Sequence, residues 1–287
     1  MQLLPSQVLR IVDAALEEDL AWGDPTTDSL IDPSLQATAY VVVKAGGIIA
    51  GLPVAALVFQ RLDACIQTRV LIPDGSPVHL GDQVAIVSGP ASGILKGERT
   101  ALNFLQRMSG IASQTAKYVA AVKGLPVQIV DTRKTAPGLR MLDKYAVRLG
   151  GGHNHRQCLG DGVLIKDNHL AAAKAAGMGL AEVIREVRQK APHTLKVEIE
   201  VECVSQALEA TEAGADIIML DNMPLEELRQ VVQLLKGKVL LEASGGITLD
   251  NVRAVAETGV DLISSGLLTH SVKALDVSLD FPAIGGG

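Results

Sequence analysis

The sequence contains few cysteines and few aromatic residues. Its 287 residues include three cysteines, one tryptophan, three tyrosines and three phenylalanines. Because Cys65, Cys158 and Cys203 are odd in number, far apart and without a CxxC pair, they indicate neither a disulfide framework nor a zinc ribbon. We therefore expect a reducing, cytoplasmic environment, with Cys158 and Cys203 as small core residues.

Excess positive charge and long apolar runs are also absent from the sequence. The formal net charge is −6 at pH 7, so the protein lacks the broad basic face and the stacking aromatic residues that nucleic-acid binding usually needs. No uncharged apolar run approaches the roughly 20 residues of a membrane span. The N-terminus carries acidic residues within its apolar pattern and is not typical of a signal peptide. These absences predict that neither nucleic acid nor membrane is a partner.

Positive charge is instead concentrated in one short part of the chain. Between Asp131 and His169 the sequence reads DTRKTAPGLR, GGHNHR and LIKDNH. The cationic residues of this stretch are Arg133, Lys134, Arg140, Lys144, Arg148, Arg156 and Lys166. Glycines and strand-like segments lie between them, so we expect the charges at strand ends and in loops, where several donors can converge on one small anionic ligand.

The hydrophobic pattern changes along the chain. The first part combines an amphipathic helix beginning near Ser6, β-rich runs at 37–51, 68–72 and 83–87, and a helix at about 52–64. After Gly97 a long helix is predicted over ERTALNFLQRMSGIASQTAKYVAAV, and strands then alternate with helices. The predicted strands are VQIVDT, the short RLGG segment, GVLIKDN, KVEIEVE, DIIMLDN, VLLEASG and DLISSG.

Apolar strands followed by amphipathic helices are typical of a parallel sheet covered by helices. Six or seven such units in succession favour a barrel, with a doubly wound open sheet as the alternative. Polar residues or glycines occur near the carboxyl ends of the predicted strands, at Arg133, Lys166, Glu200, Asp221, Ser244 and Gly266. In a barrel these ends converge on one mouth, where we expect the functional site.

The residues expected at this mouth form a cationic half and an acidic half. The cationic half is Arg133, Lys134, His155, Arg156 and Lys166, and the acidic half is Glu198, Glu200, Glu202 and Asp221. The three glutamates alternate along one strand and share a face, so at most one or two reach the mouth. Acids opposite a cationic cluster suggest a hydrated Mg²⁺ shared with the ligand. The turns ASGG and SSG offer backbone N–H groups to a phosphate.

Several motifs in a fixed order give a more specific indication. ERTALNFLQRMSGIAS, DTRKTAPGLR, GGHNHR, LIKDNH, VEIEVE, MLDN and EASGGI extend over nearly the whole chain. Together they resemble quinolinate phosphoribosyltransferase (nicotinate-nucleotide pyrophosphorylase, carboxylating). The resemblance implies an α/β fold with an N-terminal α/β sandwich domain at 1–107, joined by the tail 270–287, and a C-terminal open, mostly parallel α/β barrel of six or seven strands at 108–269. It also implies a homodimer, and whether dimers assemble further is left open.

The resemblance implies a decarboxylating glycosyltransferase of NAD biosynthesis. It would transfer the phosphoribosyl group of 5-phosphoribosyl-1-diphosphate to quinolinate, giving nicotinate mononucleotide, pyrophosphate and CO₂. The implied quinolinate-binding residues are Arg133, His155, Arg156 and Lys166, with Arg99 contributed across the dimer interface. Lys134 and Lys166 are the implied contacts to the phosphates of the phosphoribosyl donor. Glu200 and Asp221 are implied to bind its ribose hydroxyls and Mg²⁺, directly or through water. Its 5-phosphate is implied to bind at Ser244, Gly245, Gly246 and Gly266.

Two other functions are compatible with parts of the pattern. A phosphoribosyltransferase-like protein associated with molybdenum transport shares the fold and several motifs, but the complete dicarboxylate set argues against it. A non-catalytic anion-binding barrel would not need Glu200 and Asp221.

Some candidate residues have a structural rather than a functional interpretation. The spacing of Arg140, Lys144 and Arg148 favours one solvated helix face. Glu198 and Glu202 are expected as structural partners, and ligand contact by His153 or Arg140 is left open.

Overall fold

The computed structural model describes residue 3 and residues 5–282, which form two compact units. The first unit contains the chain up to Ala116, Thr135–Gly151 and the chain from Ser271, and the second contains Lys117–Lys134 and Gly152–His270. The expected domain ranges, 1–107 with 270–287 and 108–269, differ from this division chiefly at segment 135–151, which belongs to the first unit. Residues 1, 2, 4 and 283–287 of those ranges lie outside the described residues.

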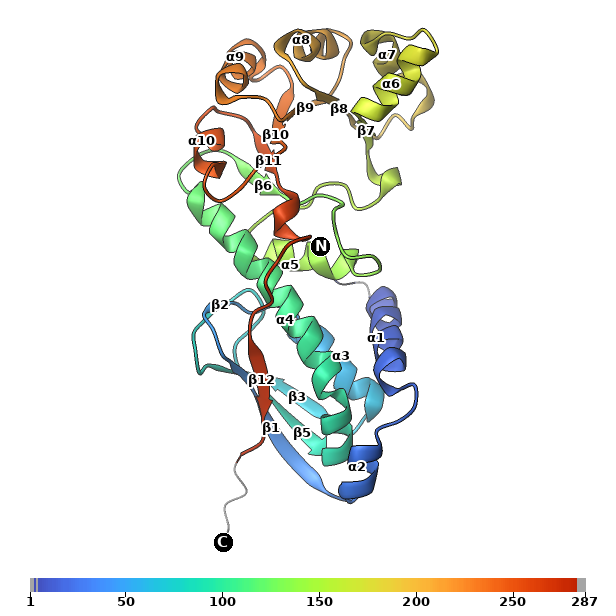
Figure 1. Ribbon diagram of the computed structural model, residues 1–287, viewed down its shortest axis with the longest axis vertical. Coiled ribbons are helices and arrows are strands. Elements are labelled where there is room, and N and C mark those ends of the chain that lie inside the picture. The colour runs from blue at the N-terminus through green and yellow to red at the C-terminus, as the bar shows by residue number, and fades with distance from the viewer. Residues whose placement is uncertain (1–2, 4, 283–287) are drawn as a thin grey trace. The chain divides into compact units, whose positions relative to one another are not determined.

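The first unit contains an antiparallel sheet in the order β12–β1–β5–β3 (Figure 1). Its strands are β1 (Gln36–Val43), β3 (Gln67–Val70), β5 (Gln83–Pro90) and β12 (Val277–Asp280), and a separate pair is formed by β2 (Gly47–Ile48) and β4 (Pro77–Val78). Alternate residues Ala39, Val41 and Val43 of β1 are buried, because successive side chains of a strand point to opposite faces. The pairing of β12 with β1 brings the C-terminal segment to this sheet.

Among the described residues of the first unit, five helices begin. They are α1 (Pro5–Leu20), α2 (Pro25–Leu30), α3 (Leu52–Leu62), α4 (Ala91–Ala121) and α5 (Arg140–Leu149). Helix α1 buries Val8, Val12 and Leu16, which are spaced by four residues and therefore lie on one helix face. Helix α1 packs against α3, and α3 packs against β3. Among the described residues, no helix has both the length and the apolar character needed to cross a membrane.

Helix α5 corrects two expectations. The RLGG segment is not a strand, because Arg148 and Leu149 end α5 and a turn follows at Gly150. A side chain at Gly150 would place its Cβ only 2.4 Å from the carbonyl oxygen of Ala112, which explains the glycine. The expected solvated face is also wrong: Lys144 is completely buried, although Arg148 is exposed. Sequence spacing shows which residues share a face, but it does not show which face packs against the protein.

The second unit contains six parallel strands in the order β6–β11–β10–β9–β8–β7. They are β6 (Gln128–Val130), β7 (Val163–Ile165), β8 (Val197–Val201), β9 (Ile217–Asp221), β10 (Leu240–Ser244) and β11 (Leu262–Ser264). Within the described residues, the edge strands β6 and β7 do not pair with each other, so the ring is open. The predicted open, mostly parallel α/β barrel of six or seven strands is confirmed, with six strands.

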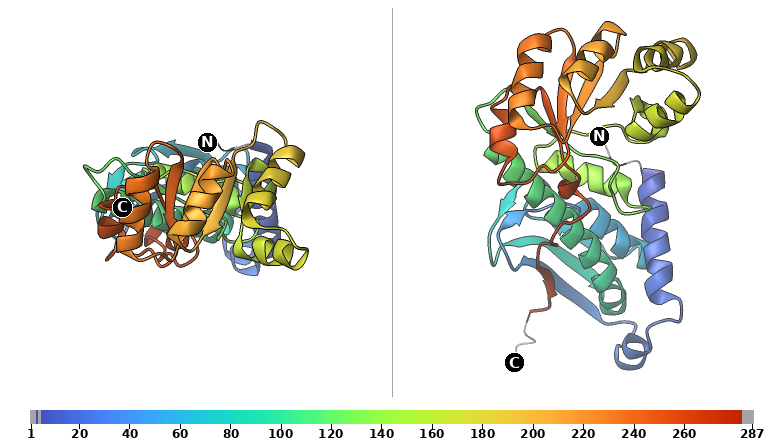
Figure 2. Two further views of the ribbon diagram at one scale, coloured as in Figure 1. Left: turned by 90° about the horizontal axis from the view of Figure 1, so that it is seen from above. Right: turned by 45° about the horizontal axis from the view of Figure 1, so that its top comes forward.

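Helices cover the outer side of this curved sheet, as Figures 1 and 2 show. They are α6 (Asp167–Ala175), α7 (Leu180–Lys190), α8 (Val204–Glu212), α9 (Leu225–Leu235) and α10 (Val252–Ala256). Two short 3₁₀ helices, η1 (Leu159–Asp161) and η2 (Gly266–Leu268), lie in connecting loops. The parallel register places Ser244 beside Asp221, and Ser264 beside Val130. The carboxyl ends of neighbouring strands therefore lie together, and they carry the polar residues of the predicted mouth.

Candidate active site

A cavity of about 570 Å³ lies at the carboxyl ends of the barrel strands. Ten of the predicted site residues line it: Arg133, Lys134, His155, Arg156, Lys166, Glu200, Asp221, Ser244, Gly245 and Gly246. Leu164 and Met219 add apolar surface between the charged groups. The structure therefore brings the cationic motifs, the two expected rim carboxylates and the glycine turn into one place.

The segment after β6 carries Arg133 and Lys134. The backbone of Lys134 is held at both ends: its N–H donates to Thr132 Oγ1 at 3.0 Å, and its carbonyl accepts from Thr269 Oγ1 at 2.7 Å. Gly266 does not line the cavity, but it permits the approach of Lys134, because an added Cβ would lie 2.7 Å from Lys134 Cδ. Arg133 is half-buried, and its buried Nε has no hydrogen-bond partner in the described structure.

Arg156 is the second guanidinium of the cationic side. Its Nη1 donates to the carbonyl of Gly162 at 3.2 Å, which fixes one edge of the planar guanidinium group. Burial, followed by the nearby positive charge of Arg133, lowers the pKa of Arg156. Two partly buried guanidinium groups that repel each other are stabilised by an anion between them, and their planar forks suit carboxylates.

Lys166 and Glu200 form an ion pair across the ends of β7 and β8. The Nζ of Lys166 lies 2.9 Å from Glu200 Oε2, and the lysine side chain is 47% exposed. The backbone N–H of Lys166 donates to His169 Nδ1 at 2.9 Å, so His169 caps the start of helix α6. Because Lys166 is exposed to water, this pair contributes little to stability and can exchange partners with an entering ligand.

Asp221 and the glycine turn are held together by Asn222, a residue that the sequence analysis did not single out. Asn222 has a left-handed backbone, with φ 52°, and its Nδ2 donates to Asp221 Oδ2 at 2.7 Å. Its side chain lies so close to Gly245 that an added Cβ would be 2.4 Å from Asn222 Oδ1. Asparagine tolerates this backbone better than most residues, so the Asp-Asn pair after an apolar strand was a usable signal.

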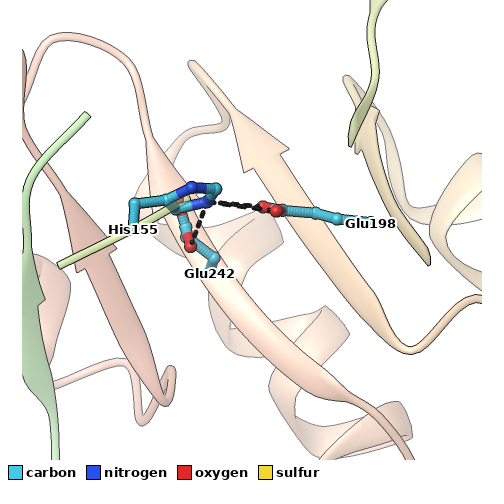
Figure 3. Close-up of side chains that lie close together, drawn as sticks. All are labelled: His155, Glu198 and Glu242. Carbon is cyan, nitrogen blue, oxygen red and sulfur yellow. Dashed lines mark hydrogen bonds and ion pairs between the residues drawn. The ribbon is translucent and has the colours of Figure 1, made fainter. Parts of the chain in front are cut away.

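His155 lines the cavity, and one nitrogen of its ring points toward both Glu198 and Glu242 (Figure 3). Its Nε2 is 3.0 Å from Glu198 Oε2 and 3.6 Å from Glu242 Oε2. Its Nδ1 accepts the backbone N–H of Arg156 at 2.8 Å, which orients the ring. Glu198 is buried here, as the expectation of a structural partner requires, whereas Glu202 is exposed.

The segment that carries His155 is anchored by Asp131, which is completely buried. One carboxylate oxygen of Asp131 accepts the backbone N–H of His155 at 2.8 Å, and the other accepts Asn154 Nδ2 at 2.7 Å. His153 forms a parallel bridge with Val130, extending the sheet at β6 by one residue. GGHNHR is therefore held in place by the sheet edge and by one buried carboxylate.

Glu242 is the other residue that the sequence analysis missed. It lies in β10 and belongs to the residues that line the cavity, although solvent does not reach it. Burial, together with the negative charge of Glu198, raises the pKa of Glu242 to about 7. A glutamate within the otherwise apolar strand segment VLLEA was the available signal, because such a residue is buried only when a partner or a proton accompanies it.

The remaining residues considered from the sequence lie elsewhere. Arg99 is exposed on α4 in the first unit. Arg140 Nε donates to Thr135 Oγ1 at 3.1 Å, also in the first unit. Cys158 is exposed just before η1, so its expected place in the core is wrong, and Cys203 is only partly buried. A small side chain is no sign of burial when it lies in a loop.

Comparison with known proteins agrees with the architecture of both units. Residues 24–109 match the family model for the N-terminal domain of quinolinate phosphoribosyl transferase, and residues 111–280 match the model for its C-terminal domain. The structure of NadC from Streptococcus pyogenes superposes with a TM-score of 0.93 at 41% identity, covering 98% of this chain and 99% of that one.

Curated relatives show the same similarity along the sequence. The probable nicotinate-nucleotide pyrophosphorylase [carboxylating] of Bacillus subtilis is 44% identical over 274 residues, which is 96% of this chain and 93% of the relative. The mitochondrial quinolinate phosphoribosyltransferase [decarboxylating] 2a of Nicotiana tabacum is 41% identical, over 94% of this chain and 80% of the relative. With both domain models matched and these relatives similar almost from end to end, the chain belongs to the quinolinate phosphoribosyl transferase family.

Proposed function

We propose that the protein transfers the phosphoribosyl group of 5-phosphoribosyl-1-diphosphate to quinolinate and releases pyrophosphate and CO₂, so that nicotinate mononucleotide is formed. The observation that carries this proposal is the mixed lining of one cavity. Arg133, His155 and Arg156, which we call the cationic half, line the same cavity as Glu200, Asp221 and the glycine turn, which we call the acidic half. A dicarboxylate and a phosphorylated sugar need these two kinds of surface in contact.

The cationic half suits the two adjacent carboxylates of quinolinate. Arg133 and Arg156 can each offer a planar pair of N–H donors, and Arg133 Nε is free of protein partners in the described structure. Lys166 extends this half to the point where the second substrate would bind, because its ammonium group is already shared with Glu200. A monocarboxylate would leave part of this positive charge without a partner, which predicts selectivity for the dicarboxylate.

The acidic half suits the phosphoribosyl donor and a magnesium ion. Glu200 and Asp221 offer hard carboxylate oxygens, which fit Mg²⁺ bound through one or two carboxylates, directly or through water. When bound, Mg²⁺ would neutralise charge on the pyrophosphate leaving group. Lys134 and Lys166 would contact the phosphates, and the turn at Ser244, Gly245 and Gly246 would receive the 5-phosphate, since glycine backbones can direct N–H groups at an anion.

The arrangement indicates catalysis by positioning and electrostatics. As the bond between ribose C1 and pyrophosphate breaks, positive charge develops on the ribose, and Glu200 and Asp221 can stabilise it while the pyridine nitrogen bonds to C1. Loss of CO₂ then leaves an electron pair on the ring carbon beside the cationic nitrogen, where it is stabilised until that carbon gains a proton. This sequence needs no covalent nucleophile from the protein.

The proposal includes a homodimer in which Arg99 is contributed across the interface. Arg99 is exposed on α4, which leaves its guanidinium accessible to a second subunit and its substrate. Three free cysteines support the further proposal of a reducing, cytoplasmic location. A dimer interface that completes the site would make activity depend on protein concentration.

The direct test is an assay of the purified protein with 5-phosphoribosyl-1-diphosphate, Mg²⁺ and either quinolinate or nicotinate. We expect pyrophosphate and nicotinate mononucleotide from quinolinate, with little product from nicotinate. Omission of Mg²⁺ and addition of a chelator serve as the metal control. No product from quinolinate, or equal turnover of both acids, would contradict the proposal.

A further inference from the structure

Glu242 poses a physical problem that the proposed reaction leaves unsolved. Its side chain has 0% exposure, and neither carboxylate oxygen has a hydrogen-bond partner in the described structure. An ionised carboxylate in such a place is destabilised by several kcal/mol unless an opposite charge accompanies it. Glu242 nevertheless lines the cavity that is proposed to receive a dianion. The negative charge of Glu242 must therefore be neutralised.

The groups facing Glu242 come from four elements. They are Glu198 on β8, His155 in the segment after the bridge to β6, Asp131 at the end of β6 and Ser264 on β11. Glu198 and Asp131 are acids and make ionisation of Glu242 less favourable. Asp131 is satisfied by two N–H donors, and Glu198 lies closest to His155 Nε2. Neither carboxylate oxygen of Glu242 has a hydrogen-bond partner of normal geometry, although the hydroxyl of Ser264 faces Glu242 and favours its ionisation.

His155 compensates the charge of Glu242 only in part. Its Nδ1 accepts the backbone N–H of Arg156 at 2.8 Å, so Nε2 is the ring atom that faces the two glutamates. Nε2 lies 3.0 Å from Glu198 and 3.6 Å from Glu242, and Glu198 is therefore the nearer partner. His155 lowers the pKa of Glu242, but burial and the negative charge of Glu198 have larger effects, so the pKa remains raised. One N–H group cannot balance two buried carboxylate charges.

A metal ion is the other way to neutralise this cluster. His155, Glu198 and Glu242 offer ligand atoms within 4.8 Å of one another. A metal on Nε2 would require the lone pair of that nitrogen, while Nδ1 already accepts a hydrogen bond. The imidazole would then have no proton on either nitrogen, whereas a histidine that binds a metal normally donates its other N–H to an acceptor. The geometry favours a proton over a metal ion.

We propose that Glu242 is a positioning residue that works in its protonated form. Together with Glu198 it confines the ring of His155 at the inner end of the cavity, and its proton removes one negative charge from beneath the bound dicarboxylate. The identity of that ligand rests on the proposed function. The state of Glu242 follows from its own surroundings.

The proposal has a thermodynamic consequence for ligand binding. When Glu242 loses its proton at alkaline pH, the inner end of the cavity gains a negative charge that opposes quinolinate. Binding there must be accompanied by uptake of about one proton, and affinity should fall about tenfold for each further pH unit. Inorganic pyrophosphate, which would bind beside Lys134 and Lys166 at the outer end, should show a weaker dependence.

The test uses calorimetric titration of the full-length protein with quinolinate, near pH 7 and about two units higher, in buffers of different ionisation enthalpy. The wild type should take up about one proton at the higher pH. Glu242→Gln, which is neutral and nearly the same shape, should bind within about threefold of wild type at neutral pH and lose the proton uptake. Glu242→Ala should bind at least tenfold more weakly, because His155 loses its packing. Persistent uptake in Glu242→Gln, or a loss of affinity equal to that of Glu242→Ala, would overturn the proposal.

A second measurement needs no ligand. The infrared spectrum of the wild type minus that of Glu242→Gln should show the carbonyl stretch of a buried carboxylic acid at neutral pH, and this band should disappear in alkaline solution. Absence of the band, or stoichiometric binding of Zn²⁺ at neutral pH that displaces one proton from the cluster, would contradict a protonated Glu242. If quinolinate failed to bind the wild type at all, the proposed function would be wrong, and the infrared result would still decide the state of Glu242.

Discussion

The inner and outer ends of the cavity contain similar residue types in opposite surroundings. At the inner end, the buried Glu198 lies 3.0 Å from the imidazole of His155, and at the outer end Glu200 pairs with a lysine that is 47% exposed. The two glutamates are two residues apart on β8 and share a face. The difference in burial therefore distinguishes the two carboxylates: Glu198 is fixed in its contact, whereas Glu200 can exchange its lysine partner for a ligand. The inner end orients groups, and the outer end is available for binding and charge transfer.

The strongest test of this contrast removes a cation from the outer end. We expect Lys166→Ala to lower turnover by about 10² to 10³, because one electrostatic contact to the developing charge is lost. Its free energy of unfolding should change by less than about 0.5 kcal/mol, since the ion pair with Glu200 is exposed to water. Steady-state kinetics and urea denaturation measure the two effects. Arg229→Ala, which removes an exposed pair with Glu226, is the matched control and should change neither. Near-normal turnover of Lys166→Ala would remove the central assignment.

The inner end should respond in the opposite way, with stability as well as activity lost. Asp131→Ala leaves the N–H of His155 and the amide of Asn154 without their buried acceptor. We expect a loss of about 2 to 3 kcal/mol in the free energy of unfolding, together with weaker quinolinate binding. Urea denaturation followed by circular dichroism, and calorimetry with quinolinate, provide the measurements. A variant as stable as wild type would show that the segment is held by other contacts.

The pH dependence of stability separates the two ends further. Burial and Glu198 raise the pKa of Glu242 from 4.5 to about 7, so the folded state holds a proton that the unfolded state releases. This contribution is fully present below pH 4.5 and is lost as the pH rises to about 7. The melting temperature of wild type relative to Glu242→Gln should therefore fall by about 3 °C or more over this range and then level off. A constant difference would show that Glu242 has an ordinary pKa.

The smallest expected effect concerns Asn222, whose left-handed backbone supports Asp221 and the glycine turn. Asn222→Ala should be about 1 kcal/mol less stable than Asn222→Gly, because only glycine adopts this conformation without strain. Both variants lose the hydrogen bond to Asp221, so both should raise the KM for 5-phosphoribosyl-1-diphosphate several-fold. Thermal melts and steady-state kinetics separate the two effects. An unchanged KM in the glycine variant would show that the amide does not orient Asp221.

Much of the outer end could be predicted from the sequence. Lys166, Glu200 and Asp221 follow or end apolar strand segments, and parallel strands followed by helices bring such positions together. The inner end was harder to predict. Glu242 is 87 residues from His155 along the chain, and no local pattern indicates that the two side chains meet. The burial of Lys144 and the helical end at Arg148 were missed for the same reason, since both depend on contacts with distant segments.

The order of strands and helices, and the residue types at each strand end, follow from local hydrophobic periodicity and side-chain chemistry, which are written in the chain itself. These were enough to predict an open α/β barrel with a divided anionic site. Which carboxylate is buried, which residue orients it and where a proton must reside depend on neighbours from other strands. Folding alone brings those neighbours together, and burial among them changes the free energy of ionisation of Glu242 in a way that no local segment can reveal.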